Sequence, residues 1–126
     1  MQERDCLMKM KKLQKELSKE IIENIENYSN NEIAFEVIKQ FVGTEIPEIE
    51  LKKIVADTLC FDFPVVTVDK NISCLELYHG PTMAFKDVGA RFMARCLGYF
   101  NSKAEKQEDV TVLVATSGDT GGAVAS

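Results

Sequence analysis

Residues 74–93 read CLELYHGPTMAFKDVGARFM, and this stretch decides which fold class the sequence predicts. Its first part, Cys74 to Tyr78, is an apolar run typical of a strand, and Gly80 and Pro81 then mark a turn. From about Met83 to Phe100, apolar side chains recur at the spacing of one helical face. We therefore expect a strand, a turn and a helix that packs on a sheet.

Further strands are predicted on both sides of this unit. The runs VVTV at 65–68 and VTVLVA at 110–115 are rich in β-branched residues, and the polar residues 101–109 indicate a surface loop. A strand, a helix and a strand in this order predict a right-handed parallel βαβ unit. Residues 123–126 resemble the first turn of another helix, so we expect a fragment whose missing part extends the sheet.

The first half of the chain predicts a small helical layer. A second helix is predicted from about Asn31 to Gly43, and a third has Pro47 in its first turn. Before them, Ser18 is suited to cap a shorter version of the first helix. The apolar side chains of that first helix share one stripe, formed by Leu13, Leu17, Ile21, Ile25 and Tyr28.

Composition and charge exclude several classes of function. The chain is 45% hydrophobic and 28% charged, as in an ordinary globular protein, and its net charge of −5 disfavours binding to nucleic acid. No apolar run reaches the roughly 20 residues of a membrane span. Four scattered cysteines and a single histidine, His79, lack the spacing of a metal site. Isolated thiols favour a cytoplasmic location.

The first candidate for chemistry is Lys86, which the turn GPTMAF delivers at or near the first turn of the predicted helix. A lysine forms an imine with an aldehyde only when its amine is deprotonated. A helix N-terminus and an apolar neighbour such as Phe85 disfavour the ammonium form and so favour a nucleophile. The alternative is an ordinary solvated lysine early in a helix, and spacing alone does not decide between the two.

The second candidate is the run TSGDTGG at 116–122, which lies between the predicted strand 110–115 and a helix. Glycines let backbone N–H groups converge on an anion, so a carboxylate or a phosphate fits there. The run matches neither G-x-G-x-x-G nor a P-loop, because no lysine follows the glycines. The alternative is a plain turn in which Asp119 or Thr120 caps the helix.

Together, the two candidates resemble the second fold type of pyridoxal-phosphate enzymes, and the threonine synthase family in particular. Residues 74–93 resemble that family's cofactor-lysine signature almost throughout. Residues 116–121 resemble its loop, with Asp119 where the related cysteine synthases typically carry Asn. The helical segment from about Leu17 to Leu59 is also similar to the region that precedes the lysine motif in this family.

The resemblance implies a fold and a set of site residues. The fold would be a truncated tryptophan synthase β-like α/β fold, with a helical N-terminal region at 1–60 and the incomplete start of the cofactor-binding domain at 61–126. Lys86 would carry pyridoxal 5′-phosphate. The remaining residues implied for the cofactor and the substrate carboxylate are Ser117, Gly118, Asp119, Thr120 and Gly121.

The resemblance also implies a reaction. In the full-length protein we expect a lyase of threonine biosynthesis that converts O-phospho-L-homoserine and water to L-threonine and phosphate. Lys86 would move protons at Cα and Cβ of the substrate. We expect this chain alone to be inactive, because the resemblance places the loop that binds the cofactor phosphate beyond Ser126.

Four neighbouring side chains receive expectations of their own. Asp87 is expected to steady the turn before the helix, and His79 is more plausibly a turn-stabilising residue than a member of the site. Arg91 and Arg95 lie one helical turn apart and could reach an anion, although solvated arginines are the commoner case.

Two other functions remain open on the sequence. One is another enzyme of the same fold type, either cysteine synthase-like or a phospho-amino-acid lyase. The other is a non-catalytic helical interaction module made from the helices between Leu13 and Leu59. A truncated sheet would leave at least one strand edge unpaired, which also predicts self-association of the chain.

Overall fold

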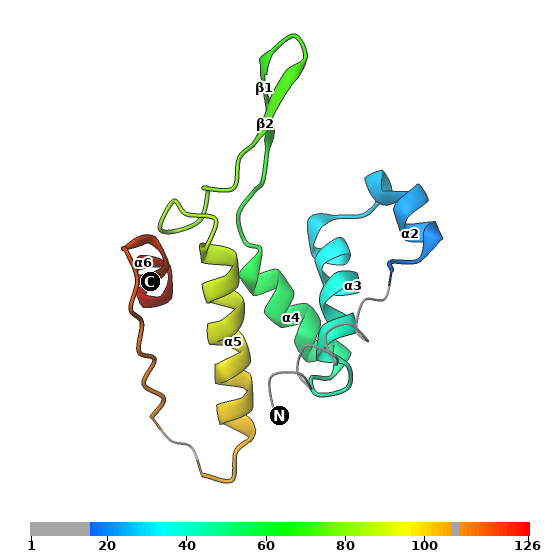
Figure 1. Ribbon diagram of the computed structural model, residues 1–126. Coiled ribbons are helices and arrows are strands. Elements are labelled where there is room, and N and C mark those ends of the chain that lie inside the picture. Colours follow the sequence, from blue (N-terminus) through cyan, green and yellow to red (C-terminus); the bar gives the residue numbers. More distant parts are fainter. Residues whose placement is uncertain (1–15, 107–108) are drawn as a thin grey trace, which may run out of the picture. The chain divides into compact units, whose positions relative to one another are not determined.

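The computed structural model describes residues 16–106 and 109–126 (Figure 1). The chain divides into two compact units, and the boundary falls between Val55 and Ala56. Leu13, on the predicted first stripe, lies outside the described residues. No helix in the described part of the chain is long and apolar enough to cross a membrane.

The first unit begins with a short helix, α2 (Lys19–Glu23), followed by a 3₁₀ turn, η1 (Ile25–Asn27). Ser18 is the N-cap of α2, as predicted, and the Ser18 hydroxyl accepts a hydrogen bond from the Ile21 N–H at 3.3 Å. The helix ends earlier than the apolar stripe predicts. Asn24 binds the Glu20 carbonyl through both its backbone N–H and its side-chain amide, which closes the last turn.

Helix α3 (Asn30–Val42) has well-defined ends, and the predicted second helix is confirmed. Ser29 and Glu32 form a capping box: the Glu32 N–H donates to the Ser29 hydroxyl at 3.3 Å, and the Ser29 N–H donates to the Glu32 carboxylate at 2.8 Å. The helix stops at Gly43, whose φ of +60° lies in the region that favours glycine.

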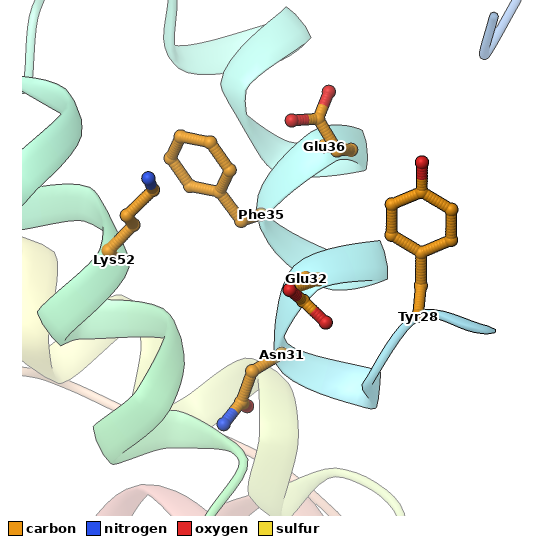
Figure 2. A pocket seen from close by; sticks show the side chains of 6 residues that line it. All are labelled: Tyr28, Asn31, Glu32, Phe35, Glu36 and Lys52. Carbon is orange, nitrogen blue, oxygen red and sulfur yellow. The ribbon is translucent and has the colours of Figure 1, made fainter. Parts of the chain in front are cut away.

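Helix α4 (Glu48–Thr58) confirms the predicted third helix. The Leu51 N–H donates to the Pro47 carbonyl at 2.9 Å, so Pro47 precedes the helix where its missing N–H costs nothing. The Lys52 ammonium lies 4.9 Å from the centre of the ring of Phe35, a residue of α3, and Figure 2 shows the two side chains next to each other. Among the described residues of the unit, the buried apolar side chains are Ile21, Phe35, Ile46, Leu51, Ile54 and Val55.

The second unit contains a hairpin of two antiparallel strands, β1 (Val65–Asp69) and β2 (Ile72–Leu75). Val65 pairs with Leu75 and Val66 with Cys74, and the register shifts between Thr67 and Asp69. The first predicted strand is confirmed. The second starts two residues earlier than predicted and stops before Glu76, and all residues of both strands are exposed.

The described residues form no strand at 110–115, where one was predicted. The predicted parallel βαβ unit is therefore wrong for these residues. The segment runs unpaired towards α6 (Asp119–Ala125), and Leu113 is 91% exposed (Figure 1). β-branched residues favour an extended backbone, but a strand also requires a hydrogen-bonding neighbour. Within residues 16–106 and 109–126, β1 and β2 pair only with each other. The coarser α/β class, helices with a small sheet, is consistent with the structure.

Helix α5 (Asp87–Lys103) begins four residues later than predicted, because Met83 has a φ of +55° that no helix accommodates. Arg91 is not a solvated side chain. Its guanidinium donates to the Asp57 carbonyl at 2.9 Å and the Thr58 carbonyl at 3.4 Å, so it joins α5 to the C-terminal end of α4. Helix α5 also packs against α6.

Candidate active site around Lys86

The turn that presents Lys86 is closed by the buried carboxylate of Asp87. This side chain has no exposed surface, and it accepts hydrogen bonds from the Thr82 N–H at 3.0 Å and the Thr82 hydroxyl at 2.5 Å. Burial raises the pKa of Asp87, but the hydrogen bonds from Thr82 and Ala84 and the charge of Arg91 outweigh it. The pKa of Asp87 is therefore lowered. The expected turn-steadying role of Asp87 agrees with this geometry.

Gly80 makes room for this carboxylate. A Cβ atom at position 80 would lie 2.8 Å from the Cβ of Asp87 and closer still to its Oδ2. Contacts this short do not occur between side chains, so any larger residue at position 80 would displace Asp87 or the turn. Gly80 is thus required by packing and not by its backbone angles.

Lys86 is the residue directly before α5, at the N-cap position. Its side chain is 31% exposed, with the ammonium 4.7 Å from the centre of the Phe85 ring. Its Nζ lies 3.5 Å from Oδ2 of Asp119, the first residue of α6. The structure therefore brings together one residue from each of the two segments that the sequence singled out.

The loop before α6 is organised by Thr116. Its hydroxyl oxygen accepts hydrogen bonds from the N–H groups of Gly118 at 3.2 Å and Gly121 at 2.9 Å. Gly118 has a φ of +140°, a backbone conformation that residues other than glycine rarely adopt. Neither Asp119 nor Thr120 caps the helix: the N-cap is Gly118, without a side-chain hydrogen bond. The two glycine N–H groups point inward to Thr116 in this conformation.

Two hollows flank Lys86. The first has a volume of about 630 Å³, within the usual range for small-molecule sites, and its wall includes Tyr78, Thr82, Lys86, Gly118 and Asp119. The second is about 400 Å³ and mostly apolar, with Phe85, Lys86, Met93, Thr120 and Val124 in its wall. Ser117 lies in the turn before α6, and Gly121 lies in the first turn of α6 itself.

The residues of the first hollow suit a flat aromatic aldehyde such as pyridoxal phosphate. Lys86 lines the space, Tyr78 and Phe85 supply aromatic wall, and Gly118 contributes no side chain there. The fit concerns the aldehyde and the ring. The glycine N–H groups that would suit a phosphate donate to Thr116 instead.

His79 lies in a small polar cluster beside this hollow. Its Nε2 is 2.7 Å from the Glu76 carboxylate, and its ring stacks on Tyr78 with the ring centres 5.0 Å apart. Hydrogen bonds from Tyr78 and His79 lower the pKa of Glu76. The bond between Tyr78 and Glu76 also raises the pKa of Tyr78. These contacts agree with the turn-stabilising role expected for His79.

Sequence reasoning gave no role to Thr82, Tyr78 or Thr116, which the structure places around the site. Thr116 precedes the glycines by two and five residues, and a hydroxyl at such spacing is a known turn-former, so its role had a local signal. The positions of Thr82 and Tyr78 depend on the fold of the turn, for which the sequence offers no periodic signal.

Another hollow, of about 450 Å³, lies in the first unit (Figure 2). Its carboxylates already have local partners: Glu32 belongs to the capping box, and Glu36 pairs with Lys39 at 2.5 Å. Phe35 is covered by the Lys39 and Lys52 ammonium groups. The charged side chains of this hollow therefore make contacts that stabilise α3.

The fold and the site define an α/β chain that sets a helix-starting lysine beside a glycine-containing loop. Comparison with known proteins shows which family the chain resembles. A family model described as the N terminus of threonine synthase matches residues 10–59. The chain is 50% identical over 90 residues to a threonine synthase of Buchnera aphidicola, and 51% identical over 89 residues to that of Serratia marcescens. Each match covers 71% of this chain and 20% of the relative.

A solved structure agrees with these sequence matches. The crystal structure of threonine synthase from Escherichia coli superposes with a TM-score of 0.76 and 41% sequence identity, covering 87% of this chain and 25% of that one. The resemblance to threonine synthases is therefore confirmed in sequence and in structure. The chain spans about a fifth of the length of the curated relatives that it matches.

Proposed function

We propose that the whole protein is a pyridoxal-phosphate-dependent threonine synthase, a lyase that converts O-phospho-L-homoserine and water to L-threonine and phosphate. The observation that carries this proposal is the Lys86 amine. It lies 3.5 Å from the carboxylate of Asp119, and both residues line one hollow, in a chain about half identical to threonine synthases over 71% of its length. The tryptophan synthase β-like fold and a cytoplasmic location are part of the proposal, and the free thiols of Cys60, Cys74 and Cys96 agree with the latter.

The residues of the chain have separate tasks in this proposal. When bound, pyridoxal phosphate would supply an electron sink that makes the substrate carbon next to the amino group more acidic. Lys86 carries the cofactor and then moves protons at Cα and Cβ of the substrate. Phosphate leaves from Cγ, and water adds at Cβ. Asp119, 3.5 Å from the Lys86 amine, stabilises that amine whenever it holds a proton.

The loop residues bind the cofactor and the substrate. The carboxylate of the substrate needs donors, and two hydroxyls are near Lys86: Ser117 is in the loop before α6, and Thr120 is in the first turn of that helix. Gly118 adds no side-chain atoms of its own to the wall of the hollow. We assign Ser117, Gly118, Asp119, Thr120 and Gly121 to these contacts as a group.

Borohydride reduction of the whole protein in the presence of pyridoxal phosphate tests the assignment of Lys86. The reagent fixes the cofactor to the lysine that holds it, and peptide mapping by mass spectrometry locates the label. We expect the label on Lys86. A label on another lysine would refute the assignment.

Substrate assays separate the proposal from its nearest rival, another enzyme of the same fold type. We expect the whole protein to release phosphate from O-phospho-L-homoserine and to form threonine. Formation of cysteine from an activated serine, or a different product from the phospho-amino acid, would favour a cysteine synthase-like enzyme or a lyase of another kind. A whole protein that takes up no pyridoxal phosphate would favour a helical interaction module.

A further inference from the structure

Among the described residues of the second unit, Asp87 is the one charged residue that is fully buried, and its neighbour Lys86 is 31% exposed. A buried carboxylate is costly unless hydrogen bonds compensate it. The donors to this one come from a single short segment, Thr82 to Ala84, which directly precedes Lys86. The carboxylate therefore joins the start of α5 to the turn before it.

The turn closed in this way is conformationally restricted. The Asp87 N–H donates back to the Ala84 carbonyl at 3.0 Å, so side chain and backbone bind the same segment from both sides. Within the loop, Met83 has a φ of +55°, which is uncommon for a residue other than glycine. Such a conformation persists only where surrounding contacts hold it in place.

The packing leaves the carboxylate little freedom to move. Gly80 lies so close that a single added carbon would collide with the side chain of Asp87. Lys86 follows the turn that contains Met83 and directly precedes Asp87. The contacts of Asp87 with residues 82–84 therefore restrict the backbone on both sides of Lys86. From there its amine reaches Asp119 and both hollows.

We infer that Asp87 is a positioning residue for Lys86: its buried carboxylate fastens the 80–84 turn to the first turn of α5 and so sets where the Lys86 amine points. The inference rests on the proposed function, in which that amine carries the cofactor and moves protons. Proton transfer and imine formation depend on placement within fractions of an ångström, so loss of the fastening reduces the rate of chemistry more than the affinity for substrate.

Four variants of the whole protein test this. Asp87→Ala removes the carboxylate, and Thr82→Val removes one hydroxyl donor while keeping its volume. Asp87→Asn keeps the shape, because its amide oxygen accepts from the Thr82 N–H and its NH₂ donates to the Thr82 hydroxyl. Asp62→Asn changes an exposed carboxylate of the same unit and serves as the matched control.

Two measurements separate positioning from stability. The first is kcat and KM for O-phospho-L-homoserine, with kcat expressed per Lys86 that borohydride labels with pyridoxal phosphate. We expect Asp87→Ala to lower this kcat by about tenfold to a hundredfold and to change KM by less than about twofold. Thr82→Val should fall between Asp87→Ala and the unchanged protein, Asp87→Asn should recover most of the rate, and Asp62→Asn should match the unchanged protein.

The second measurement needs no cofactor. In the protein freed of pyridoxal phosphate, acetic anhydride acetylates lysines in competition, and mass spectrometry compares Lys86 with the exposed Lys70. We expect the ratio to change in Asp87→Ala and Thr82→Val but not in Asp62→Asn.

The outcomes distinguish the two proposals. Failure of the unchanged protein to take the label on Lys86 overturns the proposed function, whereas the acetylation ratios still test the positioning of the amine. A normal kcat per labelled site together with a normal acetylation ratio in Asp87→Ala would overturn the inference. If Asp87→Ala does not fold, the same two normal results in Thr82→Val overturn it.

Discussion

Lys86 is the residue on which the proposed chemistry depends most directly. Lys86→Arg keeps a positive charge near Asp119, but a guanidinium stays protonated and forms no imine. We expect turnover of O-phospho-L-homoserine by the whole protein to fall by at least about a hundredfold. Lys70→Arg, at an exposed position of the hairpin, is the matched control and should keep normal turnover. Near-normal turnover in Lys86→Arg would remove Lys86 from the mechanism.

Asp87 should also make the stability of the chain depend on pH. Its pKa in the folded chain is lowered from the ordinary value of 3.8, so its contribution to folding is complete above 3.8 and is lost as the pH falls through the lower, folded pKa. Urea unfolding of the chain and of Asp87→Asn measures the effect. We expect the difference in unfolding free energy between the unchanged chain and Asp87→Asn to be largest near neutral pH and to decrease below about pH 4. A gap that stays constant down to about pH 2 would contradict the lowered pKa of Asp87.

Helix α3 owes its start to a local device, the capping box of Ser29 and Glu32. Ser29→Ala leaves the Glu32 N–H without its acceptor, and we expect the free energy of unfolding to fall by about 1 kcal/mol. Ser29→Asn supplies another side-chain oxygen at the same position and should restore most of the loss. Urea denaturation followed by circular dichroism measures both variants. Equal stability of Ser29→Ala and the unchanged chain would show that tertiary contacts alone hold the start of α3.

The β1–β2 hairpin leads to a prediction about association. Two paired strands alone are marginally stable in water, and large apolar side chains on both strands are exposed, including Val65, Val68 and Ile72. We expect the 126-residue chain to self-associate through these strands, with a mass by light scattering that increases with concentration. Val68→Lys combined with Ile72→Lys should suppress the association, because edge lysines prevent pairing between strands.

The control for this prediction is Ile49→Lys on α4. Ile49 is 71% exposed, as apolar and as accessible as the hairpin residues, but it lies on a helix and offers no free strand edge. We expect this variant to associate like the unchanged chain. Equal suppression by both variants would attribute the association to general hydrophobicity, and a monomeric unchanged chain would refute the prediction.

The 126-residue chain as a whole should bind pyridoxal phosphate weakly and should not make threonine. Its first hollow suits the aldehyde and the ring, but the glycine N–H groups near Lys86 donate to Thr116 and leave the cofactor phosphate without them. A phosphate dianion needs several donors or cations to bind tightly. Calorimetric titration of this chain with pyridoxal phosphate measures the affinity. Tight stoichiometric binding would contradict the prediction.

The sequence by itself determined the features that depend on contacts within a few residues. The caps at Ser18 and Gly43 and the position of Lys86 at the start of a helix were all predicted, because each depends on bonds between positions close in sequence. The resemblance to threonine synthases also came from contiguous motifs. It named a family without requiring any knowledge of how distant segments meet.

Only the tertiary structure decided which distant groups become neighbours. Val110–Ala115 has the composition of a strand, yet its pairing depends on a partner elsewhere, and β1 and β2 pair with each other instead. Arg91 reads as a solvated side chain, but the C-terminal end of α4 supplies carbonyl acceptors for it. The approach of Lys86 to Asp119 likewise depends on how α5 and α6 pack. Composition and periodicity record the preferences of a segment, whereas hydrogen-bond and ionic partners far along the chain are fixed only when the segments pack together.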